Sequence, residues 1–169
     1  MSYSTNDVIS FVQENDVKFI RLSFCDIFGN MKNIAIMPSA LKNAIVNGVS
    51  IDASAFTGFA YENHSDLLLM PDVSTLTVLP WRPQSGRVMR FFCDIKSPDG
   101  NAYGGDVRTA LKDTVNRVKK KGYTCEVGTE CEFFLFKTDE NGDPTKIPND
   151  NASYLDVAPL DKCENVRRE

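Results

Sequence analysis

The chain has 169 residues, of which 42% are hydrophobic and 25% are charged, as in an ordinary globular protein. This length predicts one domain or two small ones. The formal net charge of −4 and the lack of a basic stripe argue against nucleic acid as a partner. No apolar run approaches the roughly 20 residues that cross a bilayer, and the N-terminus has no signal-peptide pattern. We therefore expect no nucleic-acid or membrane partner.

The five cysteines are an odd number without C-x-x-C spacing, and several of them stand in apolar runs. This usage favours reduced thiols over a disulfide framework or a zinc site. A cytoplasmic protein is the expectation.

The first elements read as a short helix followed by a hairpin. Residues 6–14 have an apolar stripe at helical spacing, with Asn6 as the expected N-cap. Residues 17–29 alternate between apolar and polar side chains, which predicts a strand, and residues 31–37 predict the strand that pairs with it.

A helix and further strands follow. Residues 38–48 predict a helix that begins at Pro38 and ends at Gly48. Residues 49–66 are small and irregular after their first positions. Three more strands are expected, at residues 67–72, 74–81 and 87–95. One helix packed on such a small mixed sheet is an α+β roll.

The second part of the chain begins after a turn-rich segment, and we place the linker at residues 99–105. Asp106 is the expected cap of a helix that ends at Gly122. Residues 123–138 then predict a strand, and the polar residues 138–153 predict a mobile excursion.

The last residues, with Asp161 as a cap, read as a helix start without a C-cap. One strand is too little for a complete second sheet. The sequence therefore predicts that residues 106–169 are the truncated start of a larger domain.

Two carboxylates in the segment GTECEFFLF raise the question of function. On a strand, Glu130 and Glu132 share one face and lie roughly 6.6 Å apart. They are either exposed acids at a strand end or ligands of a hard cation such as Mg²⁺. Since two ligands are too few for a stable site, further ligands would have to come from elsewhere.

The segment IDASAFTGF raises a second question. Asp52 is followed by small residues and then by Gly58. It is either the start of an Asx-turn on the surface or the carboxylate of a binding loop.

An ordered series of motifs resembles the N-terminal part of class I, bacterial-type, glutamine synthetase, from about Val17 to Glu169. The motifs are C-D-I-F-G-N, S-I-D-A-S-A-F-T-G-F, S-D-L-L-L-M-P-D, L-P-W, C-D-I-K-S-P-D-G, G-G-D-V-R, G-T-E-C-E-F-F-L-F and S-Y-L-D-V-A-P. Their order and spacing make the resemblance specific.

The resemblance implies an N-terminal helix at residues 1–14 and a β-grasp domain at residues 15–98. The start of an α+β catalytic domain follows at residues 106–169. It also implies cytoplasmic homo-oligomers, which are dodecamers with active sites shared between neighbouring subunits.

The activity that the resemblance implies is ATP-dependent ligation of ammonia to L-glutamate through γ-glutamyl phosphate. The matching residues imply that Glu130 and Glu132 bind Mg²⁺ or Mn²⁺ and that Asp52 binds and deprotonates ammonium. Tyr154 matches a tyrosine beside the ammonium pocket. No residue of the chain is assigned to ATP.

The Asp52 segment departs from the family pattern, since Ala53 and Ala55 stand where the family has glycine and serine. Further metal ligands, glutamate-binding arginines and the nucleotide pocket would lie beyond residue 169. We therefore expect the chain alone to be inactive.

Two alternatives stay open. The first is a natural short binding module that docks on a complete synthetase. The second is a related γ-glutamyl ligase that acts on an amine other than ammonia.

Overall fold

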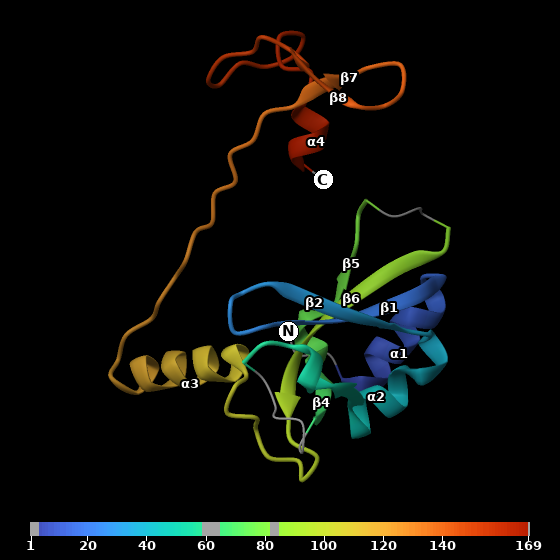
Figure 1. Ribbon diagram of the computed structural model, residues 1–169, viewed down its shortest axis with the longest axis vertical. Coiled ribbons are helices and arrows are strands. Elements are labelled where there is room, and N and C mark those ends of the chain that lie inside the picture. The colour runs from blue at the N-terminus through green and yellow to red at the C-terminus, as the bar shows by residue number, and fades with distance from the viewer. Residues whose placement is uncertain (1–3, 59–64, 82–84, 169) are drawn as a thin grey trace. The chain divides into compact units, whose positions relative to one another are not determined.

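The computed structural model describes residues 4–58, 65–81 and 85–168, which are coloured in Figure 1. The chain divides into two compact units, Met1–Cys125 and Glu126–Glu169, and each unit is described by itself. None of the helices in the described residues is long and apolar enough to cross a membrane.

The first unit is built on one mixed six-stranded sheet, with the strand order β2-β1-β6-β4-β3 and with β5 also paired to β6. Its strands are β1 (Val17–Cys25), β2 (Met31–Ile36), β3 (Val49–Asp52), β4 (Asp66–Pro71), β5 (Thr77–Val78) and β6 (Arg87–Lys96). β1 and β6 run parallel, and all other pairs are antiparallel. The predicted hairpin of β1 and β2 and the mixed α+β sheet are confirmed.

Two helices accompany this sheet, α1 (Thr5–Glu14) and α2 (Leu41–Asn47), the latter after a 3₁₀ turn at Pro38–Ala40. The predicted cap of α1 at Asn6 is wrong. Ser4 is the N-cap, because its hydroxyl and the carboxylate of Asp7 form a reciprocal capping box. Gly48 ends α2 with a φ of 74°, a conformation that favours glycine, as the sequence predicted.

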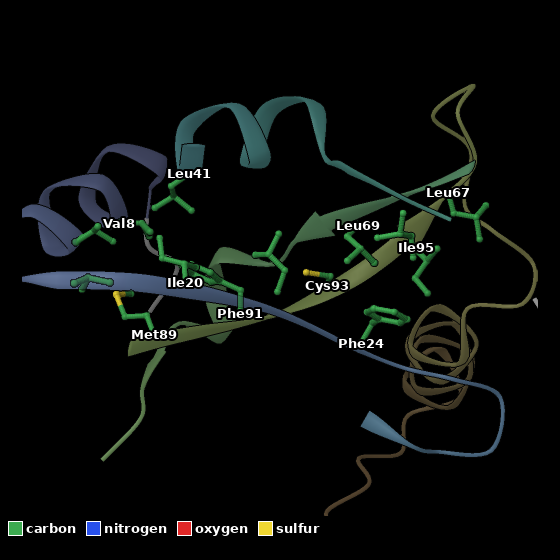
Figure 2. Packing of buried hydrophobic residues seen from close by; sticks show 14 of the residues in the cluster. Val8, Ile20, Phe24, Leu41, Leu67, Leu69, Met89, Phe91, Cys93 and Ile95 are labelled. Carbon is green, nitrogen blue, oxygen red and sulfur yellow. The ribbon is translucent and has the colours of Figure 1, made fainter. Parts of the chain in front are cut away.

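The hydrophobic core lies between the sheet and these helices. Figure 2 shows Val8 of α1 and Leu41 of α2 beside the strands that carry Ile20 and Phe91. All four side chains are at most 1% exposed. Because α1 and α2 cover one face of the sheet with apolar side chains, the sheet is held mainly by hydrophobic burial.

The predicted strand at residues 74–81 is wrong in its first half. Val73–Thr75 forms a 3₁₀ turn, and only Thr77–Val78 pairs with β6. The cause is Asp72, whose side chain accepts a hydrogen bond from the Ser74 N–H and caps the turn. Such side-chain bonds compete with the strand ladder.

Helix α3 (Val107–Lys120) begins at Asp106, as predicted. Asp106 is 3% exposed, and its carboxylate accepts hydrogen bonds from the backbone N–H groups of Arg108, Thr109 and Ile95. The apolar side chains of α3 are largely exposed among the described residues, with Leu111 63% exposed. Charged pairs, rather than these apolar side chains, hold α3 to the sheet.

The second unit contains a short hairpin of β7 (Phe136–Thr138) and β8 (Pro144–Pro148), and the short helix α4 (Glu164–Arg168). The predicted strand at 123–138 is wrong except for its last three residues. No described strand pairs with residues 123–135, and an unpaired backbone cannot form a ladder. The middle of residues 138–153, which the sequence predicts to be a mobile excursion, forms β8.

Candidate functional site

Asp52 stands at the end of β3 and opens a 3₁₀ turn at Ala53–Ala55. Its Oδ1 atom accepts hydrogen bonds from Ser54 N, at 3.0 Å, and from Ser54 Oγ, at 2.6 Å. This is the Asx-turn that the sequence allowed. No hydrogen bond or ion pair of Oδ2 is found among the described residues, and the residue is exposed.

The same type of turn occurs a second time in the chain, at Asp72, where positively charged side chains contact the carboxylate. Asp72 Oδ1 accepts hydrogen bonds from Ser74 N, at 3.1 Å, and from Ser74 Oγ, at 2.6 Å. Its Oδ2 atom accepts from Arg108 Nη2, at 2.7 Å, and from Lys112 Nζ, at 3.3 Å. In this D-x-S turn, one oxygen therefore anchors the backbone while the other receives a cation.

The hydrogen bonds from the Ser54 hydroxyl and the Ser54 N–H lower the pKa of Asp52 below its ordinary value of 3.8. The carboxylate is therefore ionised at neutral pH. A lowered pKa also makes Asp52 a weaker proton acceptor.

Glu130 and Glu132 lie on the extended segment that precedes β7, and both are exposed. Further along this segment, the ring centroids of Phe134 and Phe136 lie 6.4 Å apart.

Tyr154 and Glu132 line one hollow of about 660 Å³ in the second unit. Tyr154 is 90% exposed, and Glu130 is not among the residues that line this hollow. The structure thus brings Glu132 and Tyr154 to a common surface. Asp52 belongs to the other compact unit.

The hollow also holds a cluster that sequence reasoning missed as a possible ligand set. Asp150, Asp161 and Cys163 place one ligand atom each within 4.8 Å of one another. Asp161 already accepts hydrogen bonds from Cys163 N and Arg167 Nη2, and Asp150 Oδ2 accepts from Lys162 N. These bonds explain the cluster as local structure ahead of α4. The predicted cap at Asp161 is corrected, because α4 begins at Glu164 and Asp161 instead accepts a hydrogen bond from Cys163 N.

The donor atoms of Glu130 and Glu132 fit a hard dication in type, since Mg²⁺ and Mn²⁺ prefer carboxylate oxygens. They do not fit in number, because Mg²⁺ takes octahedral coordination and two side chains leave most positions to water or to other ligands. By themselves, Glu130 and Glu132 would therefore be an incomplete ligand set for such an ion.

Two family models match the chain in succession. The model of the glutamine synthetase β-grasp domain matches residues 16–98. The model of the glutamine synthetase catalytic domain matches residues 104–169. These two matches leave only the first residues and a short linker uncovered.

Curated relatives agree with this pattern. The glutamine synthetase of Clostridium saccharobutylicum is 48% identical over 167 residues, which are 99% of this chain and 38% of the relative. That of Methanosarcina mazei is 46% identical over 163 residues, covering 96% of this chain and 36% of the relative. The chain thus spans less than two fifths of the length of these relatives.

Solved structures share the fold. The glutamine synthetase of Plasmodium falciparum matches with a TM-score of 0.64 and 25% identity, over 72% of this chain and 24% of that one. A GmaS/ADP complex matches with a TM-score of 0.62 and 26% identity, over 72% of this chain and 26% of that one.

The fold therefore defines a protein with a β-grasp domain followed by the start of a ligase catalytic domain. The chain belongs to the glutamine synthetase family and corresponds to its N-terminal portion.

Proposed function

We propose that the chain acts as the N-terminal part of a glutamine synthetase, which joins ammonia to L-glutamate at the expense of ATP through γ-glutamyl phosphate. The observation that carries the proposal is the continuous similarity to curated glutamine synthetases across 99% of the chain. The position of Glu130 and Glu132 within the part that matches the catalytic domain supports it.

Glu130 and Glu132 are the proposed ligands for Mg²⁺ or Mn²⁺. When bound, the dications neutralise the charge that develops as the γ-phosphoryl group is transferred. The exposed carboxylates offer oxygen atoms without breaking any ion pair with other described residues.

Asp52 is the proposed binding residue for ammonium. Its Oδ2 atom is oriented by the Asx-turn, as Oδ2 of Asp72 is, and Asp72 shows that a nitrogen cation fits this geometry. The negative charge of the exposed Asp52 carboxylate supports a role in attracting ammonium before it loses a proton. Tyr154 is proposed to lie beside the same pocket.

The 169-residue chain by itself is proposed to be inactive, because it supplies two metal ligands and no assigned nucleotide pocket. In the complete protein we propose a homo-oligomer, a dodecamer, in which Asp52 serves the active site of a neighbouring subunit. Full activity then depends on both the rest of the chain and the assembly.

The test uses the complete protein that contains this chain. Release of phosphate is measured with ATP, L-glutamate and ammonium, each omitted in turn. In Asp52→Asn, kcat/KM for ammonium is expected to fall about 100-fold or more. Asp99→Asn is the matched control, because Asp99 is an exposed aspartate that also accepts a backbone hydrogen bond two residues on, from Asn101.

Two outcomes would contradict the proposal. Turnover that does not require ammonium, or that prefers methylamine to ammonium, would favour a ligase for another amine. Full ATP- and metal-dependent turnover by the isolated 169-residue chain would overturn its proposed inactivity.

A further inference from the structure

We propose that Ile27 and Phe56 are positioning residues that hold the Asp52 loop (residues 52–58) in the conformation that receives ammonium. This inference rests on the proposed function of Asp52. It deepens that function by naming the side chains that support the loop around the carboxylate.

The first contact is between two aromatic rings. Phe24, near the end of β1, is 3% exposed, and Phe56 follows the 3₁₀ turn that Asp52 caps. Their ring centroids are 5.5 Å apart with an interplanar angle of 87°. This edge-to-face pair ties the middle of the Asp52 loop to the hydrophobic core.

The second contact closes the far end of the loop. Gly58 has a φ of 82°, and a Cβ atom at this position would lie 2.1 Å from Ile27 Cδ1. Only glycine therefore allows the loop to approach Ile27 this closely without moving it. Ile27 is 42% exposed and is not part of the buried core, so a substitution at Ile27 changes the contact with the loop without disturbing the core.

The turn that carries Ile27 is itself rigid. Asp26 is 6% exposed, and its Oδ1 atom accepts hydrogen bonds from the backbone N–H groups of Phe28 and Asn30, both at 2.9 Å. Its Oδ2 atom accepts from Asn30 Nδ2 at 3.0 Å. Because these hydrogen bonds hold the turn in one conformation, they also fix the position of Ile27 against which the Asp52 loop packs.

The near end of the loop is fixed by the sheet. Asp52 pairs with Asp66 in the register of β3 and β4, and Ala53 N donates a hydrogen bond to Ser65 O at 2.7 Å. Ala53 is fully buried. The loop is thus held by hydrogen bonds at its Asp52 end. Side-chain packing at Phe56 and Gly58 holds the residues that follow the Asx-turn.

Loss of either packing contact should loosen the position of Asp52 without removing any group that binds the other substrates. In the complete protein, Ile27→Ala and Phe56→Leu are expected to raise KM for ammonium about tenfold, since small misplacements of a positioned group cost large factors. KM for L-glutamate and for ATP should not change. Ile27→Leu, which keeps a δ carbon to fill the contact, should keep KM for ammonium close to that of the unaltered protein.

Hydroxylamine distinguishes positioning from general damage. It is an uncharged nucleophile at neutral pH and does not need a carboxylate to hold it as a cation. Turnover with hydroxylamine should therefore stay close to that of the unaltered protein in both variants. Phe28→Ala is the matched control, because Phe28 is 68% exposed on the same turn and is not among the atoms nearest to Gly58.

A second measurement does not depend on activity. In the 169-residue chain, hydrogen exchange of the Ser54 amide, which donates to Asp52, should accelerate about tenfold in Ile27→Ala and remain unchanged in Phe28→Ala. Unchanged exchange together with an unchanged KM for ammonium would overturn the positioning role alone. Absence of ammonium-dependent turnover in the unaltered complete protein would instead overturn the proposed function, and the role of Ile27 and Phe56 with it.

Discussion

Arg108, in the first turn of α3, donates a hydrogen bond from Nη2 to Oδ2 of Asp72, 2.7 Å away. Its Nη1 atom binds Asp94 of β6, and Lys112 Nζ lies 2.7 Å from Asp94 Oδ2. These pairs fasten α3 to the sheet of the first unit, even though the family model of the catalytic domain begins at residue 104. The start of the catalytic domain is thereby part of the compact unit that contains the β-grasp sheet.

The first prediction concerns this ion pair. Arg108→Gln leaves two partly buried carboxylates with only Lys112 as a cation, and we expect the free energy of unfolding to fall by about 1–3 kcal/mol. Urea denaturation of the 169-residue chain measures this loss. Arg117→Gln is the control, because the Arg117 guanidinium bonds to Thr114 on its own helix. An equal effect of the two substitutions would contradict the role of Arg108.

The second prediction concerns pH. Partial burial raises the pKa of Asp72, but hydrogen bonds from Ser74, Arg108 and Lys112 outweigh it and hold the pKa well below the ordinary 3.8. Because the folded pKa is the lower one, Asp72 stabilises the fold above about pH 4 and loses this effect as the pH falls further.

Urea midpoints at pH 7, 5 and 3 test this dependence. In Asp72→Asn, stability should fall less between pH 5 and pH 3 than in the unaltered chain. Asp113→Asn, at an exposed position of α3, controls for the change in net charge. Parallel curves for all three proteins would show that Asp72 does not contribute.

The third prediction concerns the cap of α3. Asp106→Ala removes the acceptor of three backbone N–H groups and of the Thr109 hydroxyl, in a buried position. We expect a loss of about 2–4 kcal/mol in the free energy of unfolding, more than for an exposed cap. Ser4→Ala, at the exposed cap of α1, should cost about 1 kcal/mol in the same urea experiment. A smaller loss for Asp106 than for Ser4 would contradict the structure.

The fourth prediction concerns metal binding by the 169-residue chain. Two carboxylates give little chelation, so Mn²⁺ should bind only at about millimolar concentration. Broadening of nuclear magnetic resonance signals near residues 130–132 should disappear in the double variant Glu130→Gln, Glu132→Gln. It should persist in Asp150→Asn. The opposite result would locate the ion at Asp150, Asp161 and Cys163 instead, and micromolar binding by calorimetry would contradict the weak affinity.

The fifth prediction concerns thiol reactivity. Burial, with a further contribution from the charge of Asp94, raises the pKa of Cys93 to about 12. Cys125 and Cys131 are exposed. At pH 8, iodoacetamide should label Cys125 and Cys131 in the folded chain and Cys93 only after unfolding, because the thiolate is the reactive form. Mass spectrometry measures the labels, and equal rates at all three positions would contradict the burial of Cys93.

Much of the first unit could be predicted from local patterns. The alternation in β1 and β2, the positive-φ glycine after α2 and the cap at Asp106 are short-range signals, and the structure confirms them. Two local details were wrong for one reason. The side chains of Ser4 and Asp72 accept hydrogen bonds from nearby backbone N–H groups. As a result, α1 starts before the predicted cap at Asn6, and a 3₁₀ turn replaces the first half of the strand predicted at residues 74–81.

The sequence identified which residues belong to the candidate site, but it did not predict how they are arranged in space. Asp52, Glu130, Glu132 and Tyr154 were identified through motif order, and their proposed roles remain to be tested. The pattern at Glu130 and Glu132 indicates a strand, yet a strand forms only where neighbours satisfy its backbone, and none of the described strands does so there.

The sequence by itself determined the family, the α+β class and the chemical types of the proposed ligands, because motif order and side-chain chemistry are properties of the chain. Only the tertiary structure decided that α3 is held by Asp72 and Asp94. It alone also placed Ile27 against Gly58. These relationships join residues that are distant in sequence, and their distances are set by how the chain packs rather than by any local pattern.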